Sequence, residues 1–205
     1  MKKNKIETGS IIKIPLEHNL GYVLAKFINL NEIKKDIGYN EFIYVYNRIF
    51  RDEDIVINNV DDHDLLLGGI YVLNIYPALK NKTWEVLGLL KPKKIELTIP
   101  DFKDFGPVFT TYEKDAKIWY YIHNGEVNNR VAVDYEKVKH LEKFIYRAYG
   151  SIATRLTMEV IRQQGNKIEE FYKLDNHDDL VSYYNTIYTP IYSSIPEEIR
   201  GKAII

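Results

Sequence analysis

Residues 9–28 read GSIIKIPLEHNLGYVLAKFI and contain two runs rich in β-branched and aromatic residues. The first run closes at Pro15 and Leu16, and the second begins at Gly21, with four residues between them. Proline is confined to the ends and edges of strands, and glycine favours the turns that separate them. The stretch therefore predicts an antiparallel pair of strands joined by a short loop.

Several later segments also have the composition of strands. Residues 41–46 form a compact run, residues 65–76 a longer one interrupted by Gly68-Gly69, and residues 83–90 surround Trp84. Residues 91–109 contain three prolines and predict an ordered loop. Asn124-Gly125 between residues 118–122 and 127–133 favours a type I′ turn and hence a β-hairpin. Short strands punctuated by glycine and proline predict a small curled antiparallel sheet or a half-open barrel.

The last third of the chain has helical spacing. Asp134 can cap a helix that ends at Gly150, and its apolar residues recur every three or four positions, at Val138, Leu141, Ile145 and Ala148. Ser151 can cap a second helix that Gly165 ends. The fold class is thus predicted as α+β, with a curled N-terminal sheet followed by a helical C-terminal part. We divide the chain into a mainly β region, residues 1–133, and a mainly helical region, residues 134–205, that packs on it as one cooperative unit.

Composition and charge narrow the classes of function. The 205 residues include 28 basic and 29 acidic ones, for a net charge of -1, so the global basic excess of a nonspecific nucleic-acid binder is missing. The sequence has no cysteine and therefore no disulfide, thiolate nucleophile or thiolate metal site. The basic N-terminus is not followed by the apolar run of a signal peptide, and no window approaches the ~20 apolar residues of a membrane span. We expect a soluble, cytoplasmic protein that does not bind membranes.

Several short motifs occur in the order found in one family. After the opening stretch with its Ile14-Pro15-Leu16 and Gly21-Tyr22, the chain has Tyr76-Pro77, WEVLG at residues 84–88 and Pro-Asp-Phe at residues 100–102. Over residues 8–109 the chain thus resembles the immunity protein 26 family of bacterial polymorphic toxin systems, although Ser10 stands where that family usually has an acidic residue. The resemblance implies a non-catalytic protein without a cofactor, which binds a cognate toxin domain and neutralises it by occlusion.

An acidic stretch is the candidate surface for such a partner. Between residues 52 and 64 there are six carboxylates and neither lysine nor arginine: Asp52, Glu53, Asp54, Asp61, Asp62 and Asp64. Many toxins neutralised in this way are nucleases, whose clefts must be positive to hold phosphates, so carboxylates could occupy those positions. The alternative is a solvated loop whose charges only aid solubility.

Two other classes of function stay open. His63 and His177 each lie among aspartates, as in metal-dependent hydrolases, but such enzymes need further histidines on a helical scaffold, and we expect solvated loops and helix caps without a metal. No Gly-x-Ser-x-Gly motif, paired catalytic carboxylates or phosphate loop stands out, so we expect no enzyme. A small-barrel adaptor for nucleic acid or a peptide is the main alternative. It would use the basic and aromatic residues of the predicted first helix: Tyr135, Lys137, Lys139, His140, Lys143, Phe144 and Arg147.

Overall fold

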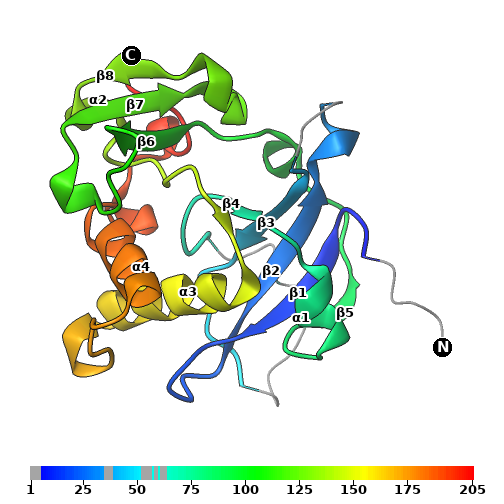
Figure 1. Cartoon of the computed structure of the whole chain (residues 1–205). Coiled ribbons are helices and arrows are strands. Elements are labelled where there is room, and N and C mark those ends of the chain that lie inside the picture. Colours follow the sequence, from blue (N-terminus) through cyan, green and yellow to red (C-terminus); the bar gives the residue numbers. More distant parts are fainter. Residues whose placement is uncertain (1–5, 35–38, 52–56, 58–59, 61–63) are drawn as a thin grey trace.

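The computed structural model describes residues 6–34, 39–51, 57, 60 and 64–205, and these form an α+β fold, as predicted (Figure 1). Within this part of the chain the strands make a six-stranded sheet, in the order β5-β1-β2-β3-β4-β9, and a three-stranded sheet, β6-β7-β8. The first sheet is open and does not close into a barrel. Strands dominate the N-terminal half and the two longest helices lie in the C-terminal half.

The first sheet grows from the opening stretch of the sequence. Strands β1 and β2 are antiparallel with Ile12 opposite Ala25, which confirms the predicted pair. Gly21 precedes β2 with φ +95°, and a Cβ there would lie 2.7 Å from the carbonyl oxygen of Phe50, so only glycine fits. The strands of this sheet are β1 (Ser10–Pro15), β2 (Tyr22–Asn29), β3 (Glu41–Val45), β4 (Ile70–Val72), β5 (Glu85–Leu89) and β9 (Tyr146–Arg147).

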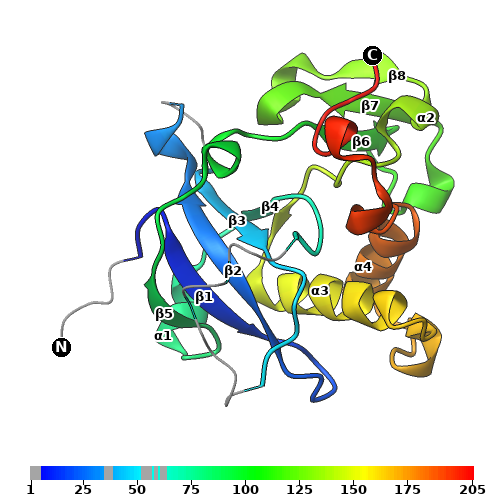
Figure 2. The same ribbon diagram turned by 180° about the vertical axis from the view of Figure 1, so that it is seen from behind.

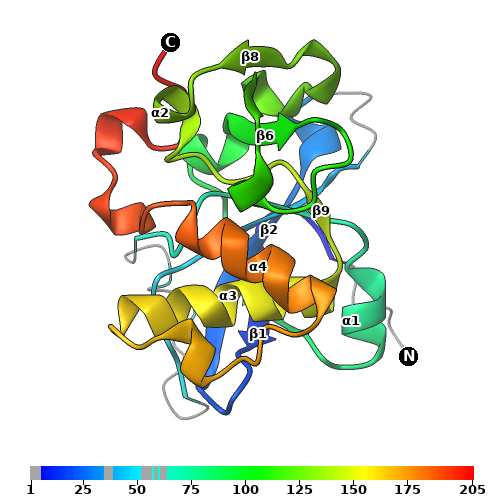
Figure 3. The same ribbon diagram turned by 60° about the vertical axis from the view of Figure 1, so that its left-hand side comes forward.

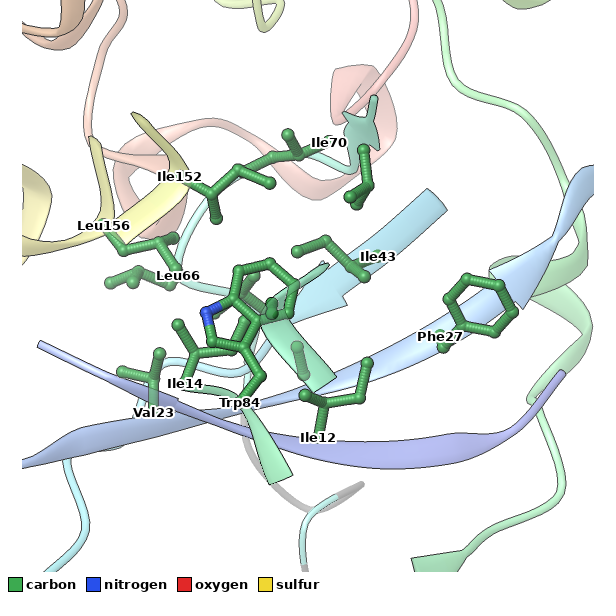
Figure 4. Close-up of a cluster of buried hydrophobic side chains, with 14 of the residues drawn as sticks. Ile12, Ile14, Val23, Phe27, Ile43, Leu66, Ile70, Trp84, Ile152 and Leu156 are labelled. Carbon is green, nitrogen blue, oxygen red and sulfur yellow. The ribbon is translucent and has the colours of Figure 1, made fainter. Parts of the chain in front are cut away.

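A helix covers one face of this sheet. The helix α3 (Tyr149–Gln163) packs Ile152, Leu156 and Val160 onto an apolar cluster that surrounds Trp84 (Figure 4). These three residues recur every fourth position and so form one stripe of the helix. Gly165, at φ +77°, follows the helix end, as predicted, although the helix begins two residues before Ser151. The helix α4 (His177–Ile187) lies against α3 (Figure 3).

The second sheet contains the predicted hairpin and one unexpected strand. Its strands are β6 (Phe102–Gly106), β7 (Ile118–Ile122) and β8 (Val131–Val133), where β6 replaces part of the predicted loop. Asn124 and Gly125 both have positive φ, as the turn prediction requires. The chain does not return at once into a strand, however. A 3-10 turn, Val127–Asn129, follows, and pairing resumes only at Val131 opposite Tyr121.

The helix predicted for residues 134–150 is wrong. Only α2 (Tyr135–Val138) forms, and the chain then leaves the helical path to pair with two strands. The backbone of Lys103 in β6 accepts from the N–H of Phe144 and donates to the carbonyl of Glu142, while β9 pairs in parallel with β4. These strand hydrogen bonds replace the helical ones, and Val138 and Leu141 are buried without a continuous helix.

The remaining helical segments are short. The α-helix α1 is Tyr76–Lys80, and Gly150 lies within α3 instead of ending a helix. The described 3-10 helices are Leu30–Glu32, Lys94–Leu97, Glu113–Asp115, His123–Gly125, Val127–Asn129, Ile168–Glu170, Tyr192–Ser194 and Glu197–Ile199. No helix in the described ranges is long and apolar enough to cross a membrane.

Buried charges hold residues 142–147, α3 and α4 together. The guanidinium of Arg155 donates to Glu142 and Glu159 at 3.2 and 2.9 Å, and all three side chains are buried. Asn185 of α4 accepts from both Arg155 and Arg147. Although burial lowers the pKa of Arg155, the carboxylates of Glu142 and Glu159 outweigh it and raise that pKa. All members of this network lie in the helical region, whereas the β region meets α3 through the apolar cluster around Trp84.

Candidate functional site

The acidic stretch lies almost entirely outside the described residues. Asp52, Glu53, Asp54, Asp61 and Asp62 belong to that part, so their role as a partner surface stays a prediction. Asp64 is described and half-exposed, and both its carboxylate oxygens lie 3.2 Å from Nη1 of Arg200. The sequence has no lysine or arginine near Asp64, but the fold brings an arginine from 136 positions further along the chain.

A cavity of about 470 Å³ lies beside strand β3, between the two sheets. Its lining comes from β3, residues 65–69, residues 95–101, the turn at residues 123–124 and the C-terminal residues 192–202. The C-terminal segment lies beside the second sheet (Figure 2) because Asp101 donates its backbone N–H to the carbonyl of Gly201. The apolar part of the wall is formed by Tyr44, Leu65, Ile95, Ile99, Pro100 and Tyr192.

Asp101 connects three segments at one end of this cavity. With the ring proton placed on Nδ1, His123 donates to Asp101 Oδ1 at 2.9 Å, and the backbone N–H of Asn124 donates to the same oxygen. The other oxygen accepts from Tyr121 Oη and from the backbone N–H of Ala203. Burial, and next the charge of Asp101, raise the pKa of Tyr121 to about 12. Asp101 therefore orients an exposed imidazole and fixes the C-terminal segment.

A buried ion pair lies on another side of the cavity. The ammonium of Lys26 in β2 donates to Glu96 at 2.9 Å, and neither side chain is exposed to a significant extent. Glu96 also accepts from Tyr46 Oη at 2.7 Å and from the backbone N–H of Lys93. Tyr44 donates to the carbonyl of Thr98, and burial raises its pKa. The polar groups beside the apolar wall are thus largely engaged with one another.

A second feature is a continuous row of ring contacts over β7, α2 and α4, which we call the aromatic band. Neighbouring ring centroids lie 4.5 to 6.4 Å apart along the row, and its rings are half-buried or exposed. Burial raises the pKa of one of them, Tyr135, to about 12. The ammonium of Lys114 lies 5.1 Å from the ring centroid of Tyr184. The members of the band are Trp119, Tyr135, Tyr188, Tyr184, Tyr112 and His177.

The loop that joins β6 to β7 exposes two large apolar side chains near this band. Phe109 is 95% exposed and Val108 is 76% exposed. The loop is held in shape, because Thr110 donates its N–H to the carbonyl of Pro107 and Lys117 closes the base by donating to Gly106. Tyr112 of the same loop contacts Tyr184 of α4. The loop therefore presents Phe109 to solvent on a fixed support.

The described residues that were weighed for metal or nucleic-acid binding do not form such a site. His177 is the first residue of α4 and lies near Tyr112, while His63 is outside the described residues. The part of the chain that the structure describes has no group of three or more His, Cys, Asp or Glu placed to hold a metal ion. The basic stripe is also broken up, because its helix does not form and both His140 and Arg147 are buried.

Sequence reasoning missed the features that the structure makes most prominent. Asp101 and His123 are 22 residues apart and meet only because β6 pairs with β7, and β6 was predicted as a loop. The exposure of Phe109 carries no sequence signal, since an isolated phenylalanine is more often buried. Comparison of the chain with protein-family models, with curated proteins and with solved structures finds no match.

Proposed function

We propose that this chain is an immunity protein that binds a cognate bacterial toxin domain and neutralises it by occlusion, without turnover. The observation that carries the proposal is the exposed pair Val108 and Phe109 on an ordered loop beside the aromatic band. Aromatic side chains dominate the energetics of protein interfaces because they combine a large contact area with few rotatable bonds. The order of the motifs in residues 8–109, which resembles that of the immunity protein 26 family, is the reason to expect a toxin as the partner.

The support for a protein partner comes from the physical character of this surface. Full burial of a phenylalanine side chain is worth roughly 1.5–3 kcal/mol relative to leaving it in water, so Phe109 is costly to expose unless something covers it. The backbone hydrogen bonds of the loop mean that little ordering would be needed on binding. The half-buried tyrosines of the band combine apolar rings with polar ends, which suits a wet interface.

The test uses the protein encoded next to this chain, which the proposal requires to be the toxin. Cells that express the toxin should survive when they also make the protein, and the two purified proteins should elute as one complex. Changing both Val108→Ala and Phe109→Ala should weaken binding roughly ten- to a hundred-fold, the range for loss of an interface hot spot. The matched control is Leu89→Ala, an exposed apolar residue of β5 that should leave binding unchanged.

The acidic stretch makes a separate prediction about the same partner. Replacing Asp61, Asp62 and Asp64 by asparagine should slow association with a nuclease toxin and flatten its salt dependence, because long-range attraction acts on the association rate. If cell survival and the association rate are unchanged in this variant, the acidic stretch is not part of the interface. The aromatic band and its neighbouring loop would then be the remaining candidate. If neither set of substitutions affects binding or protection, or if the neighbouring protein does not bind at micromolar concentration, the proposal is wrong.

A further inference from the structure

The cavity beside β3 combines an apolar wall with charged groups at its edge. Its volume of about 470 Å³ lies within the ~300–1,000 Å³ typical of sites for small organic molecules. Such sites bind an apolar body through their walls and select it through a few polar groups. The charged groups along this cavity therefore decide which ligand it can take.

The two carboxylates at the cavity already have their partners. Glu96 accepts from Lys26, from Tyr46 Oη and from the backbone N–H of Lys93. Each oxygen of Asp101 accepts from one backbone N–H and lies close to one side chain, His123 or Tyr121. Because these oxygens are satisfied within the protein, they do not call for a cationic ligand.

The arginine and the lysine that line the cavity differ in whether their charged groups have partners. The guanidinium of Arg200 is held by Asp64 and by the backbone carbonyls of Ile195 and Ser193. Lys202 is the other cation. Of the five acidic and basic side chains that line the cavity in the described part of the chain, it is the one that makes no ion pair or side-chain hydrogen bond; the others are Glu96, Asp101, His123 and Arg200.

The backbone around Lys202 is fixed even though its ammonium is free. The carbonyl of Lys202 accepts from His140 Nε2 at 2.6 Å, and the next residue, Ala203, donates to Asp101. Gly201, at φ +67°, packs against Pro100 on the other side. The structure thus holds the base of an unpaired cation at the edge of an apolar cavity.

We propose that this cavity binds a small organic monocarboxylate, whose aryl or medium-length acyl body fills the apolar wall and whose carboxylate pairs with Lys202. An ion pair at the edge of an apolar site is stronger than one in open water because the local dielectric constant is lower. A neutral ligand would bury the same apolar area without this pair. A cationic ligand would bring a like charge toward Lys202.

Calorimetric titration of the full chain tests the class of ligand. The probes are octanoate and phenylacetate, compared with octanamide and octylammonium, which keep the apolar body and change the charge. We expect saturable binding of one carboxylate per chain for at least one of the two acids. The matched amide and ammonium compounds should bind at least ten-fold more weakly.

Two pairs of variants test the location. Lys202→Gln should weaken binding of the carboxylate at least five-fold, whereas Lys173→Gln, at another exposed position, should not change it. Ile95→Trp places a large side chain at the cavity and should abolish binding, while Val131→Trp, at a comparably exposed position of β8, should not. All four positions are exposed, and circular dichroism and thermal melting check that each variant is folded.

Several outcomes would overturn the proposal. These are the absence of saturable binding for both acids, equal binding of octanoate and octanamide, or equal binding by the protein and Lys202→Gln. A short peptide that ends in phenylalanine presents the same two groups, an apolar side chain and a free carboxylate, at the end of a polypeptide. If it bound more than ten-fold tighter than the small acids, the cavity would be a site for a protein terminus and the proposal of a small-molecule ligand would be rejected.

Discussion

The two faces of α3 hold the molecule together by opposite means. One face places Ile152 and Leu156 in the apolar cluster of the first sheet. The other face places Arg155 and Glu159 in the ionic network with Glu142 and Asn185. Adjacent residues of one helix, Arg155 and Leu156, are both fully buried, yet one depends on partnered charges and the other on apolar packing.

This comparison teaches what a single buried residue contributes. The apolar face tolerates small losses, because a cavity costs an amount that depends on how far its walls relax. The ionic face does not, because removal of one partner leaves a buried charge without compensation. A network of this kind gives little net stability over an apolar core of equal volume but penalises any break in it. The following predictions test this contrast, from the largest expected effect to the smallest.

Removal of the central arginine should have the largest effect. Arg155→Met keeps most of the side-chain volume but leaves Glu142 without its arginine partner. Breaking a buried ion pair on one side costs roughly 3–5 kcal/mol. We expect a loss of about 4 kcal/mol in the free energy of unfolding, measured by urea denaturation. Adding Glu142→Gln to this variant should restore part of the loss, and a loss below about 1 kcal/mol for Arg155→Met alone would contradict a tight network.

The neighbouring apolar residue provides the comparison. Leu156→Ala removes a fully buried side chain from the cluster around Trp84 and leaves a cavity there. Substitutions of this type cost about 3 kcal/mol, with a range set by relaxation of the site. Urea denaturation under the same conditions as for Arg155→Met measures the loss in the free energy of unfolding. Leu156→Met, which nearly conserves volume, should lose under about 1.5 kcal/mol, and equal losses in the two variants would show that packing at this face is loose.

The buried Lys103 should make the free energy of unfolding depend on pH. Burial lowers the pKa of its ammonium to about 7, although the charges of Glu142 and Glu113 act in the opposite direction. In the unfolded chain a lysine keeps its proton up to about pH 10.4, so between these pH values the unfolded state binds more protons. The free energy of unfolding should therefore rise with pH above 7, by at most about 1.4 kcal/mol per pH unit from this group.

Urea denaturation of the protein and of Lys103→Met from pH 6 to 9 measures this rise. Below pH 7 the ammonium donates to the carbonyls of Lys139 and Tyr188 and to the hydroxyl of Thr189, and both states are protonated, so its contribution is constant. The variant should lose the rise above pH 7 that Lys103 provides. Parallel pH profiles for the two proteins would show that the lysine keeps its ordinary pKa.

An exposed ion pair should have the smallest effect. Lys34 pairs with Glu126 across the two sheets, and both side chains are substantially exposed. Side-chain entropy and salt screening offset most of the attraction in such pairs. Lys34→Gln should leave the denaturation midpoint within experimental error at 0.15 M salt. A shift comparable to that of Leu156→Ala would mean that the contact between the sheets depends on this surface pair.

The contrast also explains which parts of the fold could be predicted. Strands β1 and β2 and the helix α3 follow apolar spacing that matches their buried faces, and the sequence predicts all three. Strand β6 has the sequence FKDFG, in which the second residue, Lys103, is completely buried, so the alternation of apolar and polar residues that marks a strand is hidden. The false helix after Asp134 arose because Val138 and Leu141 are buried at helical spacing by a chain that then pairs with β6 and β4.

The candidate sites were less predictable than the fold. The cavity needs Tyr44, Asp101, His123 and Lys202, which come from four distant segments and meet only through the pairing of β6 with β7 and the return of the C-terminal segment. The charged residues could be counted from the sequence, but the sequence does not show which of them form ion pairs, as the pairing of Asp64 with Arg200 illustrates. The acidic stretch around it remains a prediction for the toxin experiment to test.

The order of the elements along the chain has a consequence during synthesis. Five strands of the first sheet are complete at Leu89, but the helix that covers one of its faces ends only at Gln163. At a ribosomal rate of roughly 5–20 residues per second, that helix is made about 4–15 s later. During this interval Ile12, Val23 and their neighbours lack their helical cover. We therefore expect the nascent chain to bind ribosome-associated chaperones, and its yield to fall when translation outruns them.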